Sequence, residues 1–95
     1  MNTSEPETIR IPSLTTVELP KFAIYVTARE FSDHGGSSGL LVVGRLGHDN
    51  AERRVRVGDL VAFLDVEVRV MGIVYGGNGH EITLLVSHRN TAATP

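Results

Sequence analysis

The chain has 95 residues, of which 41% are hydrophobic, so it has room for one domain around one core. Its 9 Lys and Arg residues nearly balance its 11 Asp and Glu residues, and the net charge of -2 provides no general attraction to nucleic acid or to an anionic membrane. The sequence contains no cysteine, which excludes disulfides, thiolate metal sites and cysteine nucleophiles.

Polar segments at both ends predict two disordered tails, residues 1–8 and 89–95, around a single β-domain at residues 9–88. Glu5 and Glu7 lie in the first tail, so the rest of the chain carries 9 basic and 9 acidic residues and is formally neutral. The first residues form no apolar segment, and no stretch approaches the roughly 20 apolar residues that span a bilayer. We therefore expect a cytoplasmic protein without a membrane partner.

Apolar residues alternate with period two between short turn signals, which predicts an all-β domain. We expect a small antiparallel barrel or sandwich of about seven to eight strands, with no substantial helix. Residues 14–19 are bracketed by Pro12 and Pro20 and predict an edge strand. Residues 21–31 predict a longer strand with one buried face. Residues 40–46, which are apolar on both faces as far as Gly44, predict a central strand.

The second half of the chain predicts two hairpins. Residues 55–57 and 60–64 flank Gly58-Asp59, a two-residue loop whose glycine permits a positive φ angle. Residues 65–75 predict the next strand, with a buried face made of Val66, Val68, Val70 and Val74. Glycine-rich residues 76–79 predict a turn, after which residues 81–86 return with three side chains in the core: Ile82, Leu84 and Val86.

The stretch Val55-Arg56-Val57-Gly58-Asp59-Leu60-Val61, with residues 66–74 and Ile82-Thr83-Leu84 after it, resembles the hairpin cores of SH3-like and related small β-barrels. It also resembles small actinomycete β-domains of unknown function. These similarities cover roughly a third of the chain and imply a fold class only. They include no catalytic motif, so no functional residue is carried over.

Gly35-Gly36-Ser37-Ser38-Gly39 fits the G-x-S-x-G pattern of the α/β-hydrolase nucleophile elbow. That elbow needs a strand before it, a helix after it and a large parallel sheet, whereas here the motif leads into the predicted strand at residues 40–46. We therefore interpret it as a loop in which glycines permit turns. An anion-binding nest of backbone N–H groups is the alternative.

The four histidines have no ligand-like spacing: His34, His48, His80 and His88. In an up-and-down meander, the loops at residues 32–38, 58–59 and 76–80 lie at one end of the sheet. That end then gathers our candidate ligand-binding residues, Asp33, His34, Asp59 and His80, and the opposite end holds Asp65, His48 and His88. Because zinc sites use three or four converging ligands, we expect no metal and no other cofactor.

Asp65 and Glu67 project from one face of a predicted strand, roughly 7 Å apart by strand geometry. Two carboxylates at that separation can act as an acid and a base. Catalysis would require burial to raise the pKa of one of them. A water-facing stripe that continues with Arg69 is the simpler interpretation.

The basic cluster of the chain, Arg53, Arg54 and Arg56, is our candidate interaction face. A nucleic-acid surface would combine such a cluster with stacking aromatic residues. Since we assign Phe22 and Phe63 to the core, the remaining platforms are Tyr25, Phe31 and Tyr75. The alternative is a strand with Val inside and Arg outside, whose charges discourage aggregation through its edge.

These patterns favour a small non-enzymatic binding or accessory module that acts through a sheet edge, such as residues 14–19, or through its loops. We expect its partner to be another protein or a second copy of the chain. One alternative is a small-molecule-binding β-barrel, for example a cyclase-like or biosynthetic accessory protein, which needs an interior cavity of at least a few hundred Å³. The second alternative is an OB-like or SH3-like nucleic-acid binder, which the charge balance disfavours.

Overall fold

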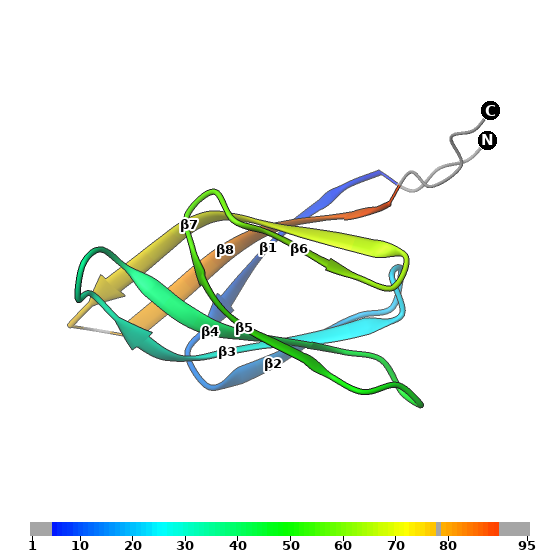
Figure 1. Cartoon of the computed structure of the whole chain (residues 1–95), viewed down its shortest axis with the longest axis horizontal. Coiled ribbons are helices and arrows are strands. Elements are labelled where there is room, and N and C mark those ends of the chain that lie inside the picture. Colours follow the sequence, from blue (N-terminus) through cyan, green and yellow to red (C-terminus); the bar gives the residue numbers. More distant parts are fainter. Residues whose placement is uncertain (1–4, 78, 90–95) are drawn as a thin grey trace.

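The computed structural model describes residues 5–77 and 79–89. Within them the chain forms antiparallel strands and no helix, which confirms the predicted fold class (Figure 1). No helix in this part of the chain is long and apolar enough to cross a membrane. The eight strands are β1 (Glu7–Pro12), β2 (Thr15–Leu19), β3 (Ile24–Ser32), β4 (Ser38–Gly44), β5 (Ala51–Arg56), β6 (Leu60–Phe63), β7 (Val66–Gly76) and β8 (Gly79–His88).

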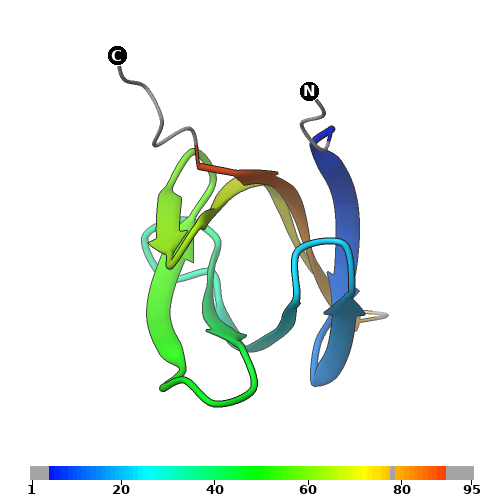
Figure 2. The ribbon, with the colours of Figure 1, turned by 90° about the vertical axis from the view of Figure 1, so that its right-hand side faces the viewer.

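The strands form two four-stranded sheets, ordered β1-β8-β7-β6 and β2-β3-β4-β5. Figure 2 shows the sheets facing one another, with β1 beside β2 on one side and β5 and β6 on the other. Both sheets are open, which is the arrangement of a sandwich. The space between them is filled by alternate side chains of both sheets, and Phe22 and Phe63 are buried with them as predicted.

β4 is an interior strand that is buried on both faces, as its apolar sequence predicts. On the outer face Val42 lies between Thr27 and Glu52 in the strand pairing and is buried. Further along the same face the Tyr25 ring lies over Gly44, where an added Cβ would overlap the ring. The close approach therefore requires glycine, and it lets the Tyr25 hydroxyl donate to Asn50 Oδ1 at 2.7 Å.

The predicted hairpin across Gly58-Asp59 is wrong. β5 and β6 belong to different sheets, and Gly58 and Asp59 form the corner between them. The corner bonds to β7 instead, since Gly58 N donates to Val70 O at 2.8 Å and Val70 N donates to Asp59 O at 2.9 Å. Gly58 has a φ of 96°, so the expected positive φ at this glycine is confirmed. The glycine lies, however, in a turn between two sheets. A Gly-Asp pair between two apolar runs is therefore compatible with a hairpin loop and with a turn between two sheets.

The prediction that Val74 faces the core is also wrong. β7 pairs with β8 regularly up to Val70 and again from Gly72, so Met71 is an extra residue in a β-bulge. The extra residue reverses the faces of the strand beyond it, because side chains alternate with period two. Val74 is therefore exposed, and Ile73 packs against the core in its place. The three valines before the bulge are buried as predicted: Val66, Val68 and Val70.

Of the remaining strands, β5 begins at Ala51, four residues before the predicted strand at residues 55–57. β2 is an edge strand, and β7 and β8 form the predicted hairpin, in which Gly76 pairs with Gly79. β1 begins at Glu7, within the segment assigned to the first tail. Residues 1–4 and 90–95 of the two predicted tails, and residue 78 of the predicted turn, lie outside the described residues.

Candidate interaction site

The second half of β7 has a strand neighbour on one side only. β6 pairs with β7 from Val66 to Arg69, and the corner at Gly58 and Asp59 extends that pairing to Val70. From residue 71 to residue 76, the described strands pair with β7 on the β8 side alone. Figure 1 shows β7 continuing past β6 to the end of the molecule. We call residues 71–76 the free edge of β7.

This free edge is apolar and exposed. Its sequence, Met-Gly-Ile-Val-Tyr-Gly, contains no charged residue and no proline. The exposed fractions are 50% for Met71, 56% for Val74 and 44% for Tyr75. A strand edge with unpaired N–H and C=O groups and apolar side chains is a template for pairing with another chain.

The other strand edges carry features that oppose such pairing. β1 ends in Pro12, which has no N–H group to donate, and β2 carries Glu18 and is followed by Pro20. β5 carries four charged residues, and β6 is only four residues long. Charges, prolines and short strands are the usual protections of sheet edges. Among the described edges, residues 71–76 stand out because they have none of the three.

Aromatic side chains support the inner side of the free edge. The rings of Tyr75 and His80 stack with centroids 4.3 Å apart and planes 15° apart. The His80 ring also lies 5.3 Å from that of Phe31, which belongs to the opposite sheet. Tyr75 is thus held in place by a stack that joins the two sheets.

The predicted ligand-binding residues have separate structural settings. Asp33 and His34 lie exposed in the turn between β3 and β4, where His34 N donates to Ser32 Oγ. The Asp59 carboxylate accepts from Arg56 N at 2.9 Å in the corner, and His80 belongs to the aromatic stack. Within residues 5–77 and 79–89, no hydrogen bond or ion pair joins two of the predicted four side chains, and no three acidic or histidine residues are placed to hold a metal ion.

The opposite end of the sandwich is closed by an ion pair that sequence reasoning missed. Arg45 Nη2 lies 2.6 Å from Asp65 Oδ1, and the same guanidinium donates to the backbone oxygens of Phe22 and Ala23 at 3.0 Å each. The Arg45 hydrogen bond holds the pKa of Asp65 below its usual value, and His88 nearby adds a smaller electrostatic contribution in the same direction. Burial opposes both but is outweighed.

This setting argues against the carboxylate pair as a catalytic acid and base. An acid at neutral pH needs a raised pKa, whereas Arg45 lowers the pKa of Asp65. Asp65 lies in the turn before β7, and Glu67 lies within the strand, opposite Ala62 of β6. Asp65 is therefore a carboxylate that fastens one end of the fold.

Two of the three clustered arginines bind groups at the end of β3, in the turn after it and at the start of β4. Arg54 Nη1 donates to Glu30 O at 3.0 Å and to Ser38 Oγ at 3.1 Å. Arg56 Nη1 donates to Gly35 O at 2.6 Å, and Arg53 is exposed. Ser38 is buried at the start of β4, and no helix follows it in the described chain, so the G-x-S-x-G pattern is not a nucleophile elbow here.

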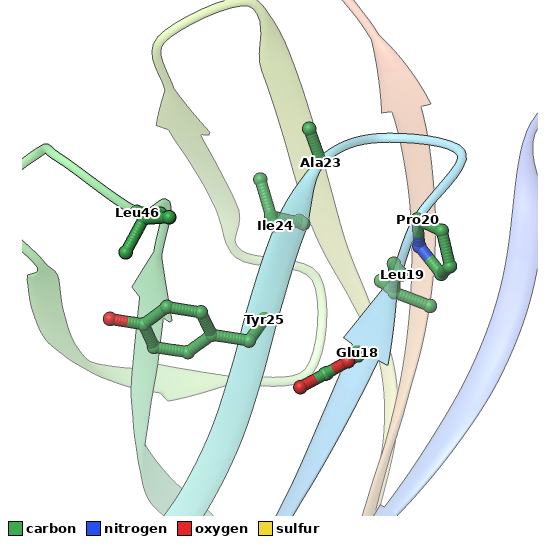
Figure 3. A pocket seen from close by; sticks show the side chains of 7 residues that line it. All are labelled: Glu18, Leu19, Pro20, Ala23, Ile24, Tyr25 and Leu46. Atoms are coloured by element: carbon green, nitrogen blue, oxygen red, sulfur yellow. The ribbon is translucent and has the colours of Figure 1, made fainter.

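A shallow depression of about 210 Å³ opens on the surface near the turn between β2 and β3 (Figure 3). Leu46, which is 95% exposed, and the Tyr25 ring lie on one side of it, and Leu19 and Pro20 lie on the other. Its remaining lining residues are Glu18, Ala23 and Ile24. The depression lies outside the space between the sheets, so it is not the interior cavity that the small-molecule alternative requires.

No family model, curated protein or solved structure matches the chain. The resemblance to SH3-like barrels and small actinomycete domains stays a prediction. The free edge of β7 is a site that the sequence patterns did not reveal, although Gly72 within a predicted strand is a signal for a bulge.

Proposed function

We propose that the protein is a non-enzymatic binding module that pairs an extended segment of a protein partner with the free edge of β7. The observation that carries this proposal is the exposed, uncharged and proline-free edge at residues 71–76. Addition of a strand to such an edge takes its affinity from main-chain hydrogen bonds and its specificity from alternate side chains.

The hairpin geometry indicates which groups bind the partner. Gly76 and Gly79 flank a two-residue connection, so they bond to one another, as do the alternate pairs further along the hairpin. Gly72 and Val74 accordingly turn their N–H and C=O groups toward β8. Ile73 and Tyr75 turn theirs to the free side, which gives the partner two donors and two acceptors.

The side chains on the two faces provide the selectivity. Val74 faces outward, and a partner residue opposite it gains apolar contact. Ile73 and Tyr75 face the interior side, where Ile73 packs against the core and Tyr75 stacks on His80. The preferred partner segment therefore carries β-branched side chains on both faces near its centre, which pack well on a pleated surface.

The non-enzymatic part of the proposal is supported by the contacts of the candidate reactive groups. The Asp65 carboxylate is paired with Arg45, and the Ser38 hydroxyl accepts from Arg54. The nucleic-acid alternative loses support because Arg54 is bonded to the backbone of β3 and Arg56 to the turn that follows β3. Pairing of a partner strand with β7 requires neither the Asp65 and Ser38 side chains nor these two arginines.

An NMR titration of the labelled protein tests the proposal. The probe is a soluble peptide of alternating threonine and valine with a lysine at each end. We expect chemical-shift changes centred on residues 71–76 and on β8, and their loss in Val74→Lys, because a charge on an edge opposes pairing. The matched control is Val57→Lys, since Val57 and Val74 are both 56% exposed. Shifts centred on β2, or shifts that survive Val74→Lys, would contradict the proposal.

A further inference from the structure

We infer that the partner on the free edge of β7 is a second copy of this chain, paired antiparallel about a two-fold axis that passes through Val74. This inference rests on the proposed function of the edge. A two-fold axis brings the same surface of both copies together, so the segment must be complementary to itself.

The axis position follows from the groups that face outward. Ile73 and Tyr75 carry the free N–H and C=O groups, and an axis through Val74 places Ile73 of one copy opposite Tyr75 of the other. The axis generates two such pairs, and the residues of each pair exchange two hydrogen bonds. Together they use all the outward N–H and C=O groups of the segment after the bulge. An axis through Ile73 would instead pair Tyr75 with Met71 in the bulge, where the strand is irregular.

Side chains on both faces suit this register. Val74 lies opposite its own copy on the outer face, so two exposed valines cover one another. On the inner face Ile73 meets Tyr75 of the second copy, whose ring is supported by His80. The β1-β8-β7-β6 sheets of the two copies join across the axis into one sheet of eight strands.

The distribution of charge favours self-pairing of the free edge of β7 over self-pairing of β5. β5 carries one acidic and three basic residues, so two copies of β5 brought together would each carry a net charge of +2 and would repel one another. The free edge of β7 has no charge to oppose itself. The nearest acidic residue, Glu81, pairs with Val74 on the far side, so the two Glu81 copies are separated by three strand spacings, about 14 Å, which exceeds the screening length of about 8 Å.

The size of the contact sets the expected strength. Stable complexes bury about 1,200–2,000 Å² of total surface. Pairing along one edge of six residues gives a much smaller interface. We therefore expect a dimer that dissociates on dilution. The monomer and dimer exchange reversibly, and the monomer's free edge remains open to other strands.

Cysteine cross-linking tests the register, because the chain has no cysteine of its own. In Val74→Cys the two thiols face each other across the axis, with Cα atoms about 4.5 Å apart, a separation that a disulfide accepts. We expect mild oxidation to give a disulfide-linked dimer at least tenfold faster than in Val57→Cys, which has the same exposure, or in Glu81→Cys, whose copies are too far apart. Analytical ultracentrifugation of the unmodified chain should show mass rising from monomer to dimer with concentration, and Val74→Lys should stay monomeric.

Equal cross-linking rates in the three cysteine variants, with a monomeric mass at every concentration, would overturn the inference. The threonine-valine peptide separates this outcome from failure of the proposed function. If the peptide still shifts residues 71–76, the edge binds strands but not its own copy. If neither the peptide nor the second copy binds, both the inference and the proposed function are wrong.

Discussion

The two halves of β7 have similar apolar sequences but opposite surroundings. Before the bulge, Val66, Val68 and Val70 are buried and the strand is paired on both sides. After it, Val74 is exposed and only β8 is paired. One extra residue, Met71, separates a core strand from an open edge. Hydrophobicity alone therefore does not say whether a strand contributes to the core or to a binding surface.

The largest expected difference between the halves is in stability. Val70→Ala removes two methyl groups from a buried site and should lower the free energy of unfolding by about 1.5–3 kcal/mol. Val74→Ala should change it by less than about 0.5 kcal/mol, because the side chain is exposed. Urea denaturation of dilute protein measures both. Equal losses would mean that the bulge does not turn Val74 away from the core.

A smaller effect is expected at the aromatic support of the free edge. Tyr75→Leu loses the stack on His80 and should lower the free energy of unfolding by about 0.5–1 kcal/mol. Tyr75→Phe keeps the ring and should cost less than about 0.5 kcal/mol. The comparison is made by urea unfolding of the two variants. If phenylalanine and leucine are equivalent there, the ring stack does not stabilise the edge.

The smallest effect concerns the ion pair at the turn where β7 begins. The folded-state pKa of Asp65 is lowered, so its stabilisation is present above the unfolded pKa near 3.8 and is lost as pH falls through the folded value. The pair is partly exposed, so the contribution should be about 1 kcal/mol or less. Urea midpoints below pH 4 should fall more for the unmodified chain than for Asp65→Asn. Parallel curves would remove the Arg45–Asp65 pair as a source of acid sensitivity.

The core was predictable from the sequence because burial imposes a regular pattern. Ile82, Leu84 and Val86 alternate along β8 and are all buried, and the doubly apolar β4 is an interior strand. Both predictions depend on the period-two geometry of strands, which a single sequence displays directly. Fold class, edge strand β2 and the terminal hairpin follow from the same rule and from turn residues.

The free edge was not predictable in the same way, because it depends on where neighbouring strands end. Gly58-Asp59 has the chemistry of a hairpin loop, yet it turns between sheets, and only the three-dimensional pairing distinguishes the two. The bulge at Met71 shifts the face of Val74 without interrupting the apolar run. Predicted residues such as Asp33 and Asp59 were grouped by assumed loop positions, and each has its own local contacts.

Amide hydrogen exchange across the bulge tests most directly whether the second half of β7 is an open edge. The Val70 N–H donates to Asp59 O at 2.9 Å and should exchange slowly, while those of Ile73 and Tyr75 should exchange at least a hundredfold faster in dilute protein. Raising the protein concentration should slow exchange at Ile73 and Tyr75 but not at Val70. Equal protection of all three amides in the dilute monomer would contradict the account, because the edge would already be closed.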